Sequence, residues 1–177
     1  MVKMTNELFE KFSKKQEELD SVIREKRNIS LEEWNSSNRY FFKHMLALIN
    51  EKNEFINECR DIWKYWKTKQ IVPEKLIDEA VDVIHCMHLI DNKKSSHEWF
   101  SIDVSTINEV IKRVKASGKM EFCPEEVLFH FEKTDDLNEI YGRLLSILDH
   151  YAFTLHDIEV AYDNKNKENH KRQKNNY

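Results

Sequence analysis

Apolar residues recur at helical spacing along most of the chain. Between about Asn6 and Lys26 they stand three, four and seven positions apart and form one stripe, made by Leu8, Phe9, Phe12, Leu19 and Ile23. Ser30 fits the N-cap of a short helix, with Glu33 as its capping-box partner. A longer stripe then runs from about Asn38 to Lys69, through Phe42, Met45, Leu46, Ile49, Ile56, Cys59, Trp63 and Trp66. Both patterns predict amphipathic helices packed on a partner surface.

The segment after Pro73 is apolar around almost its whole circumference. Pro73 fits the first turn of a helix that continues to about Ile90. A helix without a polar face belongs in the centre of a bundle. The region that follows, residues 92–136, is less regular. It contains one short predicted helix from Val104 to Lys115, and we interpret Gly118 and Pro124 as further breaks.

The C-terminal part changes from apolar to basic. A strong helical pattern spans Leu137 to His150, and a cap at Thr154 or Asp157 begins a last helix toward Asn164. The remaining residues, 163–177, are polar and basic and carry no apolar stripe. Composition alone predicts a disordered tail here.

Composition restricts the fold class. A chain of 177 residues suits one domain, covering residues 1–177. The chain contains only 2 Gly and 2 Pro, too few for the turns of a strand-rich fold, so we expect an all-α helical bundle. The charged fraction is 34% but the net charge is only -4. Such a mixed surface points neither to nucleic acid nor to a membrane, and a polyanionic substrate would need local positive charge.

The cysteines and the apolar runs indicate the compartment. Three cysteines, Cys59, Cys86 and Cys123, lie in helical patterns, which favours buried thiols in a reducing compartment over a disulfide framework. No apolar run approaches the roughly 20 residues of a membrane span. We therefore expect a cytoplasmic, soluble protein.

Two pairs of carboxylates carry the chemical signal. Glu51 and Glu54 stand three residues apart on one helix, and Glu79 and Asp82 repeat this spacing on the apolar helix. A charge on such a helix needs a compensating cation, and no Lys or Arg occurs from Glu79 to Ile90, so a partner helix or a metal must supply it. Two helices that each present two carboxylates make an oxygen-only cage, which suits Mg²⁺.

Other metals fit these residues less well. A bundle di-iron site needs two Glu-x-x-His motifs, and the chain has only Asp82-x-x-His85. His85, Cys86 and His88 point to different sides of one helix, and no second cluster completes four zinc ligands. We interpret them as core residues, with His85 a candidate partner of Asp82.

Four separated motifs carry a family resemblance. The dimeric dUTPases, within the MazG-like all-α NTP pyrophosphatase group, have a first metal motif that resembles LALINEKNEFINECRDIWKYWK, from Leu46 to Lys67. Their second metal motif resembles Glu74 to Ile90, and their closing motif resembles Asp157 to Tyr177. A Gln-x-x-Leu-Asp segment of their first helix is similar to residues 16–20. The order is collinear, and the region 92–136 matches poorly.

The resemblance implies a magnesium-dependent enzyme. Such an enzyme would convert dUTP, and also dUDP, to dUMP with release of pyrophosphate or phosphate. This reaction limits uracil incorporation into DNA. The family pattern places two or more Mg²⁺ ions on Glu51, Glu54, Glu79 and Asp82. By similarity Glu51 takes the proton of the attacking water, and the attack falls on the β-phosphorus. A homodimer is also implied.

The resemblance also changes the interpretation of the tail. Lys165, Asn169 and Arg172 stand three to four residues apart, so an ordered helix would align them toward the phosphates, and Asn166 would reach the same anion or a metal. Residues 163–177 then close over the substrate. Lys64 is a further candidate for phosphate, with an exposed, solvated lysine as the alternative.

The base site is indicated by fewer residues. Gln16 resembles the family position near the uracil pocket. Trp66 or Trp34 would stack on the base through its flat indole ring, although Trp66 also fits a plain core role. One departure from the family lies at Lys52-Asn53, where small or apolar residues are usual, and we expect Lys52 to face solvent.

Two rival functions share these motifs. One is an all-α pyrophosphatase for another nucleotide, such as dCTP. The other is a non-catalytic regulatory module that binds a protein partner through the same helical framework. Cellular and phage-encoded origins fit the sequence equally.

Overall fold

The computed structural model describes residues 2–67, 70–93, 100–116 and 122–175. Within these ranges the chain forms helices and no strand, which confirms the predicted all-α class. The helices are α1 (Asn6–Arg27), α2 (Leu31–Ser36), α3 (Asn38–Glu58), α4 (Arg60–Trp63), α5 (Pro73–Asp91), α6 (Val104–Lys115), α7 (Pro124–Lys133), α8 (Leu137–His150) and α9 (Leu155–Lys174). None of the helices in these ranges is long and apolar enough to cross a membrane.

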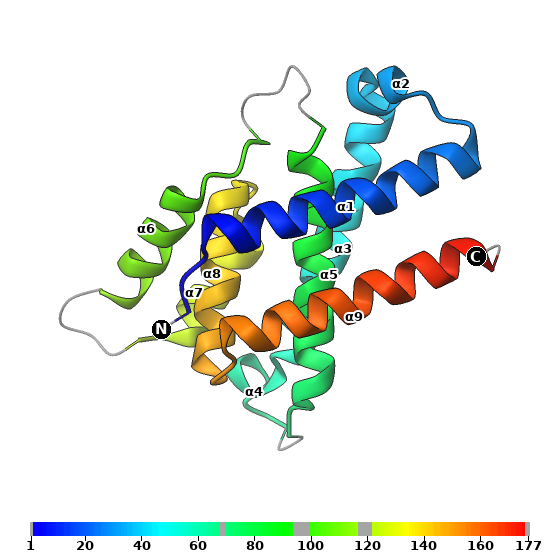
Figure 1. The fold of residues 1–177 in the computed structure, drawn as a ribbon. Helices are drawn as coiled ribbons and strands as arrows, with labels where there is room; N and C mark the ends of the chain where they lie inside the picture. The colour runs from blue at the N-terminus through cyan, green and yellow to red at the C-terminus, as the bar shows by residue number, and fades with distance from the viewer. Residues whose placement is uncertain (1, 68–69, 94–99, 117–121, 176–177) are drawn as a thin grey trace.

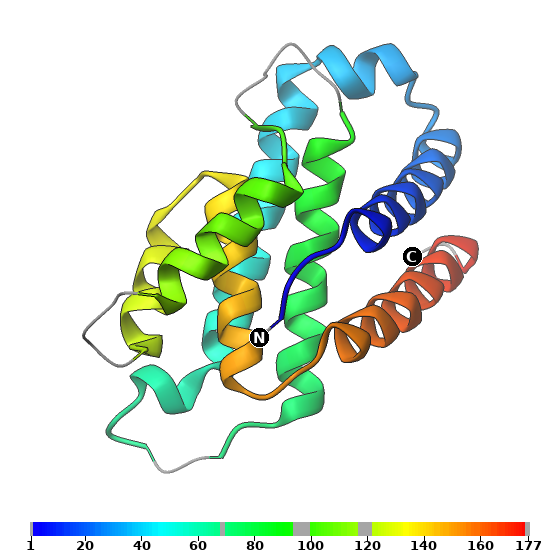
Figure 2. The same cartoon turned by 60° about the vertical axis from the view of Figure 1, so that its left-hand side comes forward.

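Helix α5 occupies the centre of the bundle, as its apolar circumference predicts. It contacts α1, α3, α8 and α9. In Figure 1, α1 and α9 cross in front of α5 while α3 lies behind it, and Figure 2 shows the same order from another side. Most of the side chains of α5 from Ala80 to Ile90 are buried. The carboxylates of this helix are therefore held on a largely buried element at the centre of the bundle.

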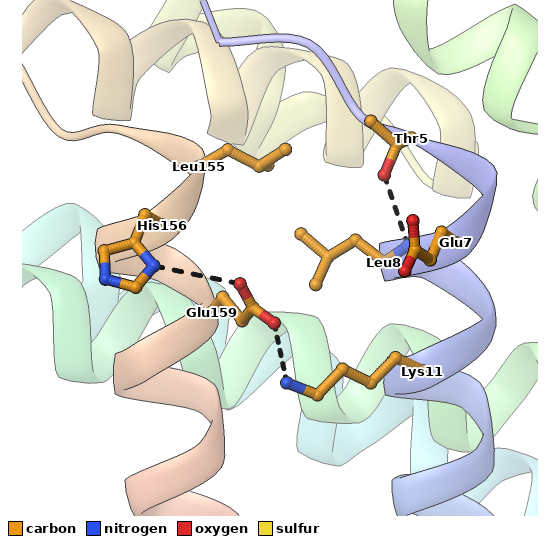
Figure 3. A pocket seen from close by; sticks show the side chains of 7 residues that line it. All are labelled: Thr5, Glu7, Leu8, Lys11, Leu155, His156 and Glu159. Atoms are coloured by element: carbon orange, nitrogen blue, oxygen red, sulfur yellow. Dashed lines mark hydrogen bonds and ion pairs between the residues drawn. The ribbon is translucent and has the colours of Figure 1, made fainter.

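Helices α1 and α9 run side by side in the same direction. Lys11 on α1 pairs with Glu159 and Asp163 on α9 at 2.7 and 2.9 Å, and Lys15 pairs with Asp163 at 2.7 Å. Figure 3 shows the first of these contacts, where Lys11 reaches Glu159 across a pocket between the two helices. Stacking of the rings of Phe12 and Tyr162, with centroids 3.9 Å apart, adds apolar contact. Helix α9, which carries the basic C-terminal residues, is thus anchored along α1.

The predicted N-caps at Ser30 and Thr154 are confirmed. The Ser30 side chain accepts a hydrogen bond from the Glu33 backbone N–H at the start of α2. At the start of α9, Thr154 and Asp157 form a reciprocal capping box. Helix α9 then continues to Lys174, beyond the end predicted near Asn164, so the polar residues that composition assigned to a disordered tail are helical.

The long helix predicted from Asn38 to Lys69 ends earlier. Helix α3 stops at Glu58, and a separate turn, α4, follows. The indole N–H of Trp63 folds back and donates to the Ile56 carbonyl at 2.8 Å, one of the carbonyls left free by the helix end. Apolar periodicity continued through this break, which is why the sequence pattern did not reveal it.

The described part of the irregular region includes helices α6 and α7. The predicted helix from Val104 to Lys115 is confirmed as α6, and Pro124, interpreted as a break, stands in the first turn of α7. Helix α6 packs closely on α8 at Gly142, where an added Cβ would lie only 2.6 Å from the Val110 Cβ. This region therefore completes the bundle on the side away from α9 (Figure 1).

Candidate active site

Three of the four predicted metal ligands come together between α3 and α5. Glu51 lies on α3, and Glu79 and Asp82 lie one turn apart on α5. One carboxylate oxygen from each lies within 4.8 Å of the others, and all three side chains are half-buried. We call these residues the acidic cluster. Their donors are all hard oxygen atoms, the type that Mg²⁺ prefers.

The acidic cluster is electrostatically unfavourable without a cation. Burial raises the pKa of Glu79 to about 7, and the nearby charges of Asp82 and Glu54 add to this effect. Burial and then the charge of Asp82 also raise the pKa of Glu51. Partly desolvated like charges of this kind form a site where a bound cation would be strongly stabilised.

Glu54 lies near the acidic cluster but is not part of it. Its side chain is exposed, and one of its oxygens accepts a hydrogen bond from the Asn50 amide at 2.6 Å. Its charge still raises the pKa of Glu79, so the two carboxylates share one electrostatic field. The packing of α3 on α5 therefore separates the two members of the first predicted pair.

Helix α9 brings a lysine to the carboxylates of α5. The ammonium of Lys165 lies 2.6 Å from Asp82 and 2.8 Å from Asp78, with only 8% of its side chain exposed. Burial alone would lower the pKa of Lys165, but the two carboxylates outweigh it and raise that pKa to about 12. Asp78 was not predicted, because an acid on the first turns of a helix is usually solvated.

The other predicted phosphate residues lie along the same helix. Asn166 is buried and donates to the Lys15 carbonyl at 3.3 Å, while Asn169 is half-buried. Arg172 pairs with Glu168 at 2.6 Å, and its charge lowers the pKa of Asp82. On α9, Lys165 contacts Asp82 of the acidic cluster and Arg172 acts on Asp82 through its charge, whereas the hydrogen bond of Asn166 goes to α1.

Gln16 belongs to a second group of buried polar residues, between α1 and α5. Its amide donates to Asp20 at 2.8 Å, and its carbonyl oxygen lies 2.6 Å from Nδ1 of His85. The His85 ring stacks on Tyr162 with centroids 4.1 Å apart. His85 thus meets Gln16, and no hydrogen bond joins it to Asp82 within the described part of the chain.

This second group extends to Lys93 and Trp34. Burial raises the pKa of Asp20 to about 7, and burial lowers the pKa of Lys93 to about 8. The Lys93 ammonium lies 5.7 Å from the Trp34 ring centroid. We call Gln16, Asp20, His85 and Lys93 the buried polar cluster.

Several atoms of the buried polar cluster lack hydrogen-bond partners. Among the described residues these are Asp20 Oδ2, His85 Nε2 and Lys93 Nζ, all of them buried. Buried polar atoms are normally paired, because an unpaired one costs roughly 1–3 kcal/mol. Their grouping in one place is typical of a site that a polar ligand completes.

Trp66 and Lys64 lie elsewhere, after α4. Trp66 is 59% exposed, and its ring contacts are with its neighbours Trp63 and Tyr65. Lys64 lies over the Trp63 ring at 4.3 Å. In the described ranges no hydrogen bond or ring contact joins Trp66 to Gln16, so the structure does not bring the two predicted base contacts together.

Lys52 differs from its predicted position. It is buried, and its ammonium donates to the carbonyls of Glu132 and Thr134 at 3.1 and 2.8 Å. These carbonyls lie at the C-terminal end of α7, where the helix dipole favours a cation. Lys52, which departs from the family pattern, thus links α3 to the end of α7. The expectation that Lys52 faces solvent is wrong.

Comparison with known proteins identifies the family. A family model described as dUTPase matches residues 8–177, nearly the whole chain. No curated protein and no solved structure matches the chain. The motifs on α1, α3, α5 and α9 all lie inside the matched range. The chain therefore belongs to the dUTPase family, in its all-α branch, and is a dUTP diphosphatase.

Proposed function

We propose that the chain hydrolyses dUTP, and also dUDP, to dUMP in a Mg²⁺-dependent reaction centred on the acidic cluster. The observation that carries this proposal is the meeting of Glu51, Glu79 and Asp82 within 4.8 Å, next to Lys165 of α9. Two or more Mg²⁺ ions would be held by these carboxylates together with Glu54. When bound, Mg²⁺ supplies a Lewis acid that polarises phosphoryl oxygens and acidifies water.

Glu51 is the proposed proton acceptor. Its carboxylate belongs to the acidic cluster, and its raised pKa makes it a stronger base than an exposed glutamate. From this position it would orient the attacking water and take its proton. Glu79 and Asp82 come from the rigid central helix, so they fix the place where the reaction occurs.

The basic face of α9 supplies charge for the phosphates. Lys165 and Arg172 stand seven residues apart, about 10 Å along the helix. The ammonium provides a point charge and the guanidinium a bidentate fork. Asn166 and Asn169 add amide donors between them, and Lys64 is a further candidate from the segment after α4. Residues 163–177 thus act as the closing segment of a single domain.

The buried polar cluster is the proposed base site. Uracil offers two carbonyl acceptors and one N–H donor, which requires polar partners of both kinds. Gln16 has an amide that provides both, and the unpaired atoms of Asp20, His85 and Lys93 surround it. Trp34, whose ring lies over Lys93, is favoured over Trp66 as the stacking ring.

We also infer a cytoplasmic homodimer. Cys59, Cys86 and Cys123 are free thiols, which fit a reducing compartment. The exposed apolar residues Phe42, Leu46 and Ile49 of α3 support self-association.

A nucleotide panel tests the proposal. The purified chain is incubated with dUTP, dUDP, dCTP and dTTP, with and without Mg²⁺, and release of pyrophosphate or phosphate is followed. We expect turnover of dUTP and dUDP only with Mg²⁺, and at least about 100-fold slower turnover of the other nucleotides. Equal turnover of dUTP and dTTP would refute the selectivity for uracil. Turnover in the presence of EDTA would refute the dependence on Mg²⁺.

A further inference from the structure

Helix α9 supplies the cation that the central helix lacks. No Lys or Arg occurs on α5 from Glu79 to Ile90, and α9 crosses in front of α5 in Figure 1. Where the two helices meet, the ammonium of Lys165 lies 2.6 Å from Asp82 Oδ2 and 2.8 Å from Asp78 Oδ2. Only 8% of the Lys165 side chain is exposed, so solvent has little access to this contact. A positive charge of the chain itself thus already pairs with Asp82.

The charge of Lys165 acts on the whole acidic cluster. Burial raises the pKa of Glu51, Glu79 and Asp82, and the charge of Lys165 opposes this rise in all three. The net direction is still upward for each carboxyl, so one ammonium compensates the cluster only in part. The acidic cluster therefore still attracts a cation of higher charge.

Lys165 and a divalent ion would share the carboxylate of Asp82. Two positive charges at one carboxylate repel each other, and a divalent ion attracts that carboxylate more strongly than a single ammonium does. Asp78 offers Lys165 a second partner, since it lies outside the acidic cluster and half of its side chain is exposed. The ammonium can therefore leave Asp82 and keep its pair with Asp78.

The helix that carries Lys165 is fixed on both sides of this exchange. The ring of Tyr162 stacks on Phe12, and its hydroxyl donates to the Phe12 carbonyl at 3.1 Å. Asp163 pairs with Lys15 at 2.7 Å. These contacts anchor α9 to α1 and involve neither Asp78 nor Asp82. The exchange needs only a rotation of the Lys165 side chain, with no movement of the helix.

We propose that Lys165 and the divalent cation compete for Asp82, so that the metal-free site is closed by a lysine of the same chain. This competition rests on the proposed function, which places Mg²⁺ on the acidic cluster. In the metal-free chain Lys165 pairs with both Asp78 and Asp82. In the loaded chain it pairs with Asp78 alone, and its ammonium is available to the phosphates of the nucleotide. The chain then binds the metal most tightly together with its nucleotide, because the phosphates receive the displaced lysine.

Metal titration of Lys165→Met without nucleotide tests the competition. Mn²⁺, followed by electron paramagnetic resonance, is titrated into the parent and into the variant. We expect the variant to bind Mn²⁺ about 20-fold more tightly, a coupling of the usual size between two groups that exclude each other. The same substitution lowers kcat/KM for dUTP, because the phosphates lose the ammonium. Metal affinity and activity should therefore change in opposite directions.

Lys167→Met is the matched control for this titration. It removes one positive charge from an exposed position of the same helix, and at physiological ionic strength it should leave the Mn²⁺ affinity unchanged. Equal or weaker Mn²⁺ binding by Lys165→Met would overturn the competition and leave the metal site of the proposed function in place. A parent that binds no Mn²⁺ even with a dUTP analogue would refute both.

Acetylation of Lys165 in the parent gives a readout that needs no substitution. The chain is treated briefly with acetic anhydride, with and without saturating Mg²⁺ and without nucleotide, and the modified lysines are quantified by mass spectrometry. We expect Mg²⁺ to speed the modification of Lys165 about tenfold, because its ammonium leaves an enclosed position for a more open one. The exposed Lys167 serves as the internal reference. If Mg²⁺ leaves the rate at Lys165 unchanged or lowers it, the lysine and the metal do not compete for Asp82.

Discussion

The two sides of α5 carry polar groups of opposite character. Toward α3, the acidic cluster is partly open, and its carboxylates repel one another. Toward α1, the buried polar cluster is closed and contains unpaired hydrogen-bonding atoms. The first needs a cation, and the second needs a ligand with its own donors and acceptors. A single central helix can thus separate phosphate chemistry from base recognition.

We expect the largest effect on activity from Asp82→Asn, on the acidic side of α5. The change removes a metal ligand and the closest partner of Lys165, so kcat should fall about 1,000-fold. The fold should persist, because burial raises the pKa of Asp82 and its ionised form is unfavourable in the metal-free chain. Steady-state kinetics and a thermal melt measure the two effects. Glu74→Gln, an exposed acid at the start of the same helix, should behave as the parent.

Lys165→Met tests the contribution of α9 to the acidic side. We expect a loss of about 100-fold in kcat/KM, because the charge that faces the phosphates disappears. Lys167→Met is the matched control, an exposed lysine on the same helix, and it should retain full activity. Asp78→Asn should cost less than Lys165→Met, since Lys165 keeps its pair with Asp82. Full activity of the Lys165 variant would remove α9 from the phosphate site.

Gln16→Leu addresses the opposite side. The ratio of kcat/KM for dUTP to that for dCTP should fall at least about tenfold, because a buried donor and acceptor pair is lost. Gln70→Leu, at an exposed position, should leave the ratio unchanged. If Gln16→Leu instead slows both nucleotides equally, Gln16 acts through the fold and not through base selection.

Asp20→Asn should give the smallest effect, on stability. The folded-state pKa of Asp20, about 7, lies above the ordinary value of 3.8. The buried acid is therefore favourable below about pH 4, and its contribution is lost as the pH rises toward 7. Substitution should raise the free energy of unfolding at pH 8 by about 1–2 kcal/mol relative to the parent, with little change at pH 4. Urea unfolding of the metal-free chain at both pH values measures this, and identical pH profiles would contradict the assignment.

Local patterns predicted much of this architecture. The apolar circumference after Pro73 identified the central helix, and the three-residue spacing of Glu79 and Asp82 placed both on one face of it. These features depend only on the geometry of one helix. Thr154 and Asp157 likewise carry their capping information within four residues.

Features set by packing between helices were not visible in the sequence. The register of α3 on α5 decides that Glu51 joins the acidic cluster while Glu54 stays exposed. Lys52 is buried because the end of α7 offers free carbonyls, a partner 80 residues away in the chain. Asp78 looks like an ordinary surface acid in the sequence. It pairs with Lys165 only because α9 packs against α5.

The most direct test of the account is the number of metal ions bound to the acidic cluster. Electron paramagnetic resonance can count bound Mn²⁺, as a substitute for Mg²⁺, in the parent and in Asp82→Asn, each with a non-hydrolysable dUTP analogue. We expect specific binding in the parent and its loss in Asp82→Asn. Equal metal binding by both proteins would contradict a site built on Glu51, Glu79 and Asp82.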